Sequence, residues 1–238
     1  MRNSCNPGRH NARGFTLIEV LISMAVLVTL TGAIFEQINH MQKKASSESI
    51  KVDMGQQSNE FVDQITRDLH TAGYPNAAMY AAPLDATSDQ VAAGLVAVSP
   101  THILLEGDVT GDGKVSSVNI DYVAADANDP SCPCVRRSAG IKVPGSPLSQ
   151  PQAAVYSEIS QVVPPGTGAG QSGEDLFAFY DQNGNPVTLS DSADVTDPTT
   201  IAQISTVKIN VSLLASTPDP ANGAPMRTSI SATARVSH

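Results

Sequence analysis

Residues 15–35 of the chain read FTLIEVLISMAVLVTLTGAIF, an apolar stretch in which Glu19 is the single charged residue. As a helix, about 21 residues measure about 31 Å, which matches the hydrocarbon core of a bilayer. A carboxylate within an apolar span is costly and usually marks a function with a partner nearby. The stretch therefore predicts a membrane-spanning helix, with Glu19 as a candidate functional residue.

The residues before this stretch predict its orientation. Residues 1–14 contain Arg2, Arg9 and Arg13 and no acidic residue, whereas the 238-residue chain has a net charge of −9. A positive end that precedes an apolar span stays cytoplasmic, so the remainder is expected in the periplasm. Without those three arginines, 11 basic residues face 23 acidic ones. This acidic remainder has no long basic run, so nucleic-acid binding is not expected.

Three interpretations of the N-terminal segment compete. A secretory signal peptide has a shorter apolar core and a small-x-small cleavage site, for which residues 30–33 are a poor candidate. A generic signal anchor is the second interpretation, and it leaves Glu19 without a role. The third interpretation is a processed membrane helix, in which both the basic leader and the carboxylate have a function.

The third interpretation rests on Gly14-Phe15-Thr16-Leu17-Ile18-Glu19. This segment closely resembles the N-terminal signal of type IV prepilins and type II secretion pseudopilins. The resemblance implies that prepilin peptidase cleaves between Gly14 and Phe15, and that Phe15 is then N-methylated. A carboxylate at Glu19, one helical turn away or on an adjoining subunit, can neutralise the new amine. The resemblance implies that this pairing sets the register of an incoming subunit during assembly.

A single long helix is expected from about residue 15 to residue 72. The segment contains no proline, and apolar residues continue at helical spacing after the membrane stretch. Its second half is amphipathic and is expected to pack one stripe against the head. Gly73 and Pro75 are expected to end the helix. Two helices with a break near Gly55 are the alternative.

The sequence after residue 74 changes to short alternating runs that predict strands and turns. Strands are expected at 101–105, 115–123, 154–163, 176–180, 186–189, 204–214 and 228–236. Gly111-Asp112-Gly113 and Asn183-Gly184 predict hairpin turns. Long polar loops are expected at 81–93, 126–133, 144–152, 164–174 and 190–200. The expected fold is α+β and pilin-like, with one antiparallel sheet packed on the helix.

The turn at residues 108–116 is similar to the start of a calcium loop. Oxygen ligands would come from Asp108, Thr110, Asp112 and the carbonyl group of Lys114. The twelfth position of the loop is Asn119, where a calcium loop has a bidentate glutamate. We therefore favour a glycine-rich hairpin turn with solvated acidic side chains, and calcium is kept as the alternative.

Cys132 and Cys134 form a Cys-Pro-Cys segment. An oxidising compartment permits a local disulfide between them, and a free pair stays open. Zinc is the weaker interpretation, because no second ligand pair has the usual spacing. The sequence shows no catalytic arrangement of serine, cysteine or histidine, so neither an enzyme nor a required cofactor is expected.

The order of these segments resembles PilW-like minor pilins and GspJ-like pseudopilins. The chain divides into a leader at 1–14, a membrane or filament-core helix at 15–36, an amphipathic helix at 37–73 and a periplasmic head at 74–238. The resemblance implies a minor pilin of a type IV pilus that is assembled into the filament or primes it. Its partners would be other pilin subunits, prepilin peptidase and the inner-membrane assembly platform. A J-type pseudopilin of type II secretion and a filament-tip adhesin are the alternatives.

Overall fold

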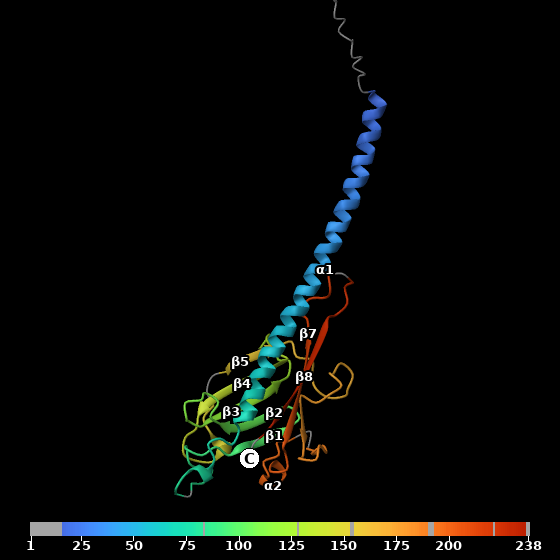
Figure 1. Cartoon of the computed structure of the whole chain (residues 1–238). Helices are drawn as coiled ribbons and strands as arrows, with labels where there is room; N and C mark the ends of the chain where they lie inside the picture. The colour runs from blue at the N-terminus through green and yellow to red at the C-terminus, as the bar shows by residue number, and fades with distance from the viewer. Residues whose placement is uncertain are drawn as a thin grey trace, which may run out of the picture.

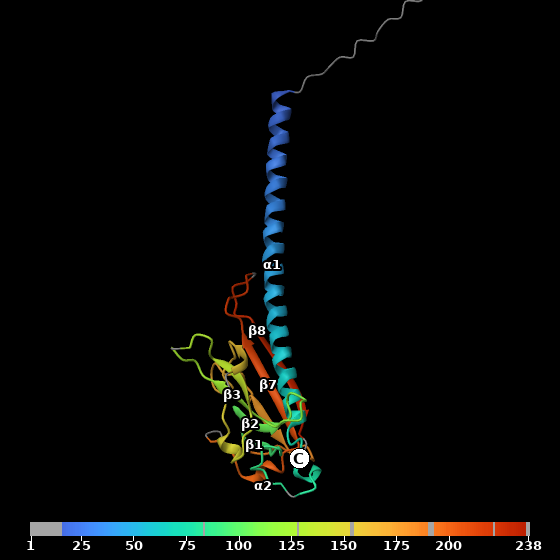
Figure 2. The ribbon, with the colours of Figure 1, turned by 90° about the vertical axis from the view of Figure 1, so that its left-hand side faces the viewer.

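A computed structural model describes residues 16–82, 84–127, 129–152, 155–189, 193–220 and 222–236 of the chain. It shows one very long helix whose C-terminal part packs against a β-rich head (Figure 1). The N-terminal part of the helix extends well away from the head (Figure 2). This is the α+β, pilin-like architecture that the sequence predicts.

Helix α1 (Leu17–Thr71) is continuous over 55 residues. The prediction of one long helix is confirmed, and the alternative of a break near Gly55 is wrong. The helix ends where Gly73 adopts a φ of 79°, a left-handed conformation that favours glycine. The amide of Gly73 donates to the carbonyl oxygen of Glu106 at 2.9 Å, which ties the helix end to the head.

The strands form two antiparallel sheets, so the expectation of one sheet is wrong. The five-stranded sheet follows chain order, with β1 (Gly94–Ser99), β2 (His102–Gly107), β3 (Ser116–Val123), β4 (Cys134–Ile141) and β5 (Val155–Ser160). The three-stranded sheet consists of β6 (Phe177–Tyr180), β7 (Thr206–Leu214) and β8 (Arg227–Arg235). Short helices lie in the connections: η1 (Ala77–Met79), η2 (Pro147–Ser149) and α2 (Pro198–Ile201).

The predicted hairpin around Gly111-Asp112-Gly113 is confirmed as β2 and β3, which pair from His102 opposite Asp121 to Gly107 opposite Ser116. The last two predicted strands are confirmed as β7 and β8, which pair with each other in the structure. Each of these pairs joins segments that are close in sequence, and the first half of β7 alternates between buried and half-buried residues. Such local signals can be read without knowledge of the rest of the fold.

The strand predicted at 186–189 is wrong. The predicted turn at Asn183-Gly184 forms, but only Pro186 pairs with Tyr180, as an isolated bridge. The carboxylate of Asp181 accepts hydrogen bonds from the amides of Asn183 and Asn185, each at 2.8 Å. These bonds turn the chain, and a proline at the next position has no N–H group for a ladder.

The sequence analysis missed β1 and β4. All six residues of β1 are buried, so the strand has no polar face that would reveal a period of two. Strand β4 contains Arg136 and Arg137 in succession, and Arg137 is the buried one. Charged residues at buried positions hide a strand from a reading of hydrophobic alternation.

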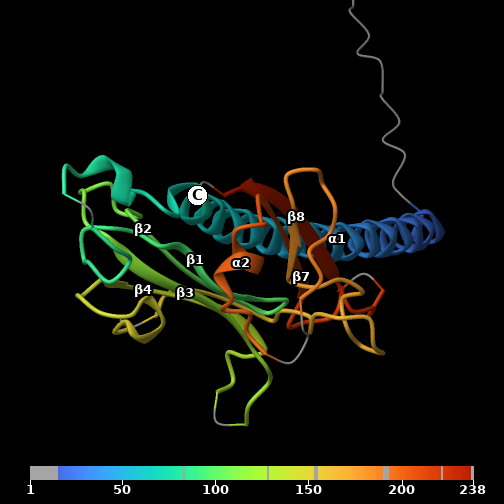
Figure 3. The same cartoon turned by 90° about the horizontal axis from the view of Figure 1, so that it is seen from below.

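The core lies between the second half of α1 and both sheets. The buried residues of the helix recur every three or four positions and are Ser47, Met54, Ser58, Phe61, Val62, Ile65, Asp68 and Leu69. The apolar residues among them pack in one cluster with buried residues from both sheets, such as Ile103, Val118 and Ile209. Figure 3, a view from below, shows the helix lying along one side of the two sheets.

A close backbone approach at Gly107 fixes the end of the helix on β2. A Cβ atom at Gly107 would lie 2.4 Å from the carbonyl oxygen of Thr71, so only glycine fits there without movement of the backbone.

A buried ion pair lies near this contact. The Nζ atom of Lys142 is 2.6 Å from the Oε2 atom of Glu106, and both side chains are fully buried. Burial raises the pKa of the Glu106 carboxyl group. Lys142 also donates to the carbonyl oxygens of Ala86 and Val91, which anchors the loop before β1.

Candidate functional site

The N-terminal half of α1 is the most unusual surface of the protein. Every residue from 16 to 46 is exposed, although residues 17–35 are almost all apolar. By its length and composition, this helix is long and apolar enough to cross a membrane. A helix that is apolar on all sides is normally covered by lipid or by other protein, because water solvates such a surface poorly. The surface is consistent with membrane anchoring.

The hydroxyl groups within this apolar half are satisfied by the helix itself. The hydroxyl of Ser23 donates to the carbonyl oxygen of Glu19 at 2.8 Å, and that of Thr31 donates to Leu27 at 2.7 Å. Thr29 donates to the carbonyl oxygen of Val26 at 2.8 Å. An unsatisfied polar group is costly in hydrocarbon, so these bonds let the three side chains lie in an apolar environment. The sequence analysis did not consider these residues.

Glu19 lies in the first turn of α1, with its amide donating to the carbonyl oxygen of Thr16 at 3.1 Å. Its side chain is exposed. Within the residues that the structure describes, the carboxylate forms no hydrogen bond or ion pair. An acidic side chain is favoured at the N-terminus of a helix by the helix dipole. The predicted cleavage residues, Gly14 and Phe15, lie outside the described residues, as does the predicted leader.

A long apolar helix that projects from an antiparallel β head is the architecture of a type IV pilin-like protein. Comparison with known families supports this class, because residues 9–35 match the family described as the prokaryotic N-terminal methylation motif. No curated protein and no solved structure matches the chain. The chain is therefore type IV pilin-like, with a prepilin-type methylation motif that includes Gly14, Phe15 and Glu19.

The predicted calcium residues lie together in the turn between β2 and β3. The carboxylate of Asp108 accepts hydrogen bonds from the amides of Gly111 at 2.7 Å, Asp112 at 3.2 Å and Gly113 at 2.9 Å. This arrangement closes the turn without an ion.

Asp112, in the same turn, accepts from the amide of Lys114 at 3.0 Å and from the hydroxyl of Thr110 at 2.9 Å. These two bonds lower the pKa of Asp112. Among the described residues, no group of three or more His, Cys, Asp or Glu side chains is arranged to hold a metal ion. Calcium binding stays a prediction.

Cys132 and Cys134 are joined by a disulfide at the start of β4, with their Cα atoms 4.3 Å apart. Both residues are buried. Beside them, Arg136 forms an ion pair with Asp129, and Ser131 donates to the same carboxylate. Hydrogen bonds from Ser131 and then from Arg136 lower the pKa of Asp129 to about 2. The disulfide and this ion pair together close the loop between β3 and β4.

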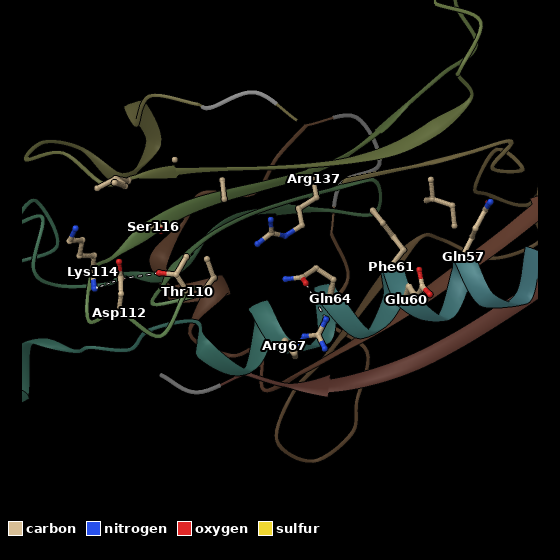
Figure 4. A pocket seen from close by; sticks show the side chains of 15 residues that line it. Gln57, Glu60, Phe61, Gln64, Arg67, Thr110, Asp112, Lys114, Ser116 and Arg137 are labelled. Atoms are coloured by element: carbon tan, nitrogen blue, oxygen red, sulfur yellow. Dashed lines mark hydrogen bonds between the residues drawn. The ribbon is translucent and has the colours of Figure 1, made fainter. Parts of the chain in front are cut away.

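A cleft of about 790 Å³ separates α1 from the five-stranded sheet. Figure 4 shows Gln57, Phe61, Gln64 and Arg67 on the helix side, with Arg137 opposite them. The rim carries Asp112 and Lys114 from the turn described above. Charges of both signs line the cleft. The sequence analysis missed it because one wall comes from residues 57–67 and the other from residues 109–159, which are far apart in the chain.

Proposed function

We propose that the chain is a minor pilin subunit of a type IV pilus, processed by prepilin peptidase and assembled into the filament or priming its growth. The observation that carries this proposal is the exposed apolar half of α1 at residues 17–35, which lies within the methylation motif matched at residues 9–35. Such a surface needs lipid before assembly and neighbouring helices afterwards. Cleavage after Gly14 would remove residues 1–14 and leave Phe15 as the new N-terminus.

The proposed mechanism is assembly, not catalysis. The basic leader keeps the N-terminus cytoplasmic, and the helix spans the inner membrane with its head in the periplasm. Extraction into a filament exchanges lipid contacts for helix contacts. Because lipid tails are about as apolar as leucine, this exchange gains little hydrophobic free energy. The free energy of helix association therefore comes from close packing and from polar pairing. Glu19 supplies the polar pairing, with the amine of a processed N-terminus as its partner.

The same features suit a J-type pseudopilin of type II secretion, which differs in the machinery that assembles it. A binding role for the head at the filament tip is a second candidate function. It is favoured by the cleft beside Arg67 and Lys114, which is open to solvent and carries hydrogen-bonding groups. Binding of a surface ligand by the full-length chain, with loss of binding in Arg67→Ala, is the test of that role.

The first experiment is the intact mass of the chain extracted from membranes of cells with and without prepilin peptidase. We expect peptidase-dependent loss of residues 1–14 and the gain of one methyl group. Gly14→Leu is the matched variant that should stay uncleaved. An unprocessed wild-type chain, or cleavage near Ala33, would contradict the proposal. Repeating the measurement on sheared filaments from strains that lack either the pilus or the secretion assembly ATPase distinguishes the two systems.

A further inference from the structure

Strand β8 forms an open edge of the three-stranded sheet. It is the last strand in the order β6-β7-β8, and it pairs with β7 over nine residues without a bulge. The amide of Val236 donates to the carbonyl oxygen of Ser205 at 3.0 Å, and the carbonyl oxygen of Met226 accepts from the amide of Ala215 at 2.8 Å. Because the direction of hydrogen bonding alternates along a strand, the even-numbered residues of β8 face β7 and the odd-numbered residues face outward.

The outward backbone groups of β8 have no partner among the residues that the structure describes. They belong to Arg227, Ser229, Ser231, Thr233 and Arg235, whose amide and carbonyl groups form no further backbone hydrogen bond there. All five residues are exposed, whereas the residues between them are half-buried or buried. A row of unpaired amides and carbonyl groups is a template on which another strand can pair.

Two other sheet edges are covered by the chain itself. On β1, Val98 and Val195 exchange backbone hydrogen bonds of 2.9 Å and 3.1 Å. On the short strand β6, the carbonyl oxygen of Phe179 accepts from the amide of Val187 at 2.8 Å. Between its terminal arginines, β8 has no proline, no charged residue and no bulge, which are the usual features that prevent strand addition.

The two ends of this edge are positively charged. Within the described part of the chain, neither Arg227 nor Arg235 forms an ion pair, and Arg227 donates only to the neutral carbonyl oxygen of Gln171 at 3.4 Å. An antiparallel pair of two β8 strands that uses their full length would place Arg227 opposite Arg235 at both ends. Like charges directly opposite each other destabilise a strand pair. A second copy is therefore disfavoured, and a partner with acidic residues is favoured.

A polar hollow of about 420 Å³ lies beside the open edge, on the outer face of the sheet. The Nζ atom of Lys208 lies 3.6 Å from the Oε2 atom of Glu174 in its lining, and the hydroxyl groups of Ser212 and Ser229 are 2.7 Å apart. Asn210 completes this polar set. Because these groups donate and accept hydrogen bonds, an added strand fits best with a polar side chain at its centre.

We propose that β8 binds an extended strand of a different protein, whose acidic residues lie eight positions apart and pair with Arg227 and Arg235. The two arginines are about 27 Å apart along the strand. Ladder hydrogen bonds to the outward backbone groups provide affinity, and the ion pairs and the polar hollow provide specificity. This surface belongs to the head, so the inference goes beyond the proposed assembly role of α1 and does not depend on it.

Binding of a labelled peptide to the full-length chain in detergent micelles tests the proposal. The probe is Asp-Val-Thr-Val-Gln-Val-Thr-Val-Asp with blocked termini, and the matched control peptide has lysine in place of both aspartates. We expect the acidic peptide to bind about tenfold more tightly, because the control replaces two attractive contacts by two repulsive ones. Equal affinities, or no binding of the acidic peptide, would overturn the proposal.

Charge reversal on the chain gives the complementary measurement. Arg227→Glu combined with Arg235→Glu should reverse the preference, so that the lysine peptide binds more tightly than the acidic one. These substitutions change only exposed side chains, so the fold should be retained. An unchanged preference in this double variant would show that the peptide binds elsewhere, and the proposal would then be wrong.

The backbone edge itself is tested at Ser231. Ser231→Pro removes one outward N–H group and leaves the hydrogen bonds to β7, so the affinity for the acidic peptide should fall by about tenfold. Ser231→Ala is the matched control and should bind like the wild type. Wild-type affinity in Ser231→Pro would exclude strand addition at β8. If this variant does not fold, the charge-reversed variant still decides the question.

A second copy of the chain is the alternative occupant of the edge. Under oxidising conditions, we expect Ser231→Cys to form no more disulfide-linked dimer than the wild type. An excess of dimer in Ser231→Cys would show that two β8 strands pair with each other, and it would overturn the proposal of a different, acidic partner.

Discussion

The carboxylate of Asp68 on α1 accepts two hydrogen bonds from the guanidinium group of Arg137 on β4, from Nε at 2.5 Å and from Nη2 at 3.1 Å. The side chain of Asp68 is only 1% exposed, and that of Arg137 is 7% exposed. This paired geometry fixes both the rotation of the helix and its position over the five-stranded sheet. Gln64 donates to the same carboxylate at 3.0 Å, so the contact is part of a small buried network.

Removal of one partner from this pair should destabilise the protein strongly. We expect Asp68→Ala to lower the free energy of unfolding by about 3–5 kcal/mol, because Arg137 would keep a buried charge without its carboxylate. Urea denaturation of the full-length chain in detergent measures the change. The exposed pair of Glu48 and Lys51 is the control, and Glu48→Ala should cost less than about 1 kcal/mol. Equal losses in the two variants would show that Asp68 and Arg137 do not act as a buried pair.

Glu19 should affect assembly without affecting membrane insertion. The variant Glu19→Val makes the span more apolar, so insertion and cleavage should be retained. Incorporation into filaments should fall by at least about tenfold, since the amine of a processed N-terminus loses its counter-charge. Immunoblots of membrane and filament fractions measure both quantities. Wild-type incorporation of Glu19→Val would exclude Glu19 as the register residue.

The cap of α2 should respond to acid. The Asp197 carboxylate accepts from the hydroxyl of Thr199 at 2.5 Å and from the hydroxyl and amide of Thr200 at 2.8 Å and 3.1 Å. These bonds lower the pKa of Asp197 from an ordinary value of 3.8 to about 2. Because the folded-state pKa is the lower one, the cap is fully stabilising above pH 3.8 and is lost as the pH falls through about 2.

An NMR titration of the Thr200 amide measures this transition. We expect a midpoint near pH 2 in the wild type, and no transition in Asp197→Asn, which keeps the side-chain oxygen but cannot titrate. A wild-type midpoint near pH 4 would mean that the carboxylate is not held by these bonds in solution.

The turn between β2 and β3 should hold its shape without calcium. We expect millimolar calcium chloride to leave the Tm of the chain unchanged, because three backbone amides already occupy the Asp108 carboxylate. Asp108→Ala should cost about 1–2 kcal/mol, since those amides lose their acceptor. A rise in Tm with calcium that disappears in Asp112→Ala would establish the calcium loop instead.

Those features of the fold that depend on local sequence were predictable. The long helix follows from the absence of proline and from helical spacing, and the hairpin of β2 and β3 follows from the glycines that flank Asp112. The membrane half with Glu19 could be recognised because its pattern has a fixed spacing over a few residues. By contrast, β1 shows no alternation, and β4 places Arg137 at an inward position where an apolar residue would be expected.

Buried charges explain much of what the sequence left undetermined. Arg137 is compatible with a core because Asp68, 69 residues earlier in the chain, supplies a counter-charge. In the same way, Lys142 is buried because Glu106 and two carbonyl oxygens surround its amine. Neither pairing has a sequence signature, since the partners approach only after the strands and the helix have packed.

The sequence by itself determined the membrane-type helix, its candidate register residue at Glu19 and the type IV pilin-like class. It could do so because periodicity, charge and motif spacing act over one or two turns of helix or a single hairpin. Tertiary structure alone decided that the strands divide into two sheets and that Asp68 receives Arg137. It also decided which face of α1 the head covers and which face, from Ile34 to Val52, it leaves exposed. These outcomes depend on contacts between distant segments, whose free energies arise only when the whole chain is packed.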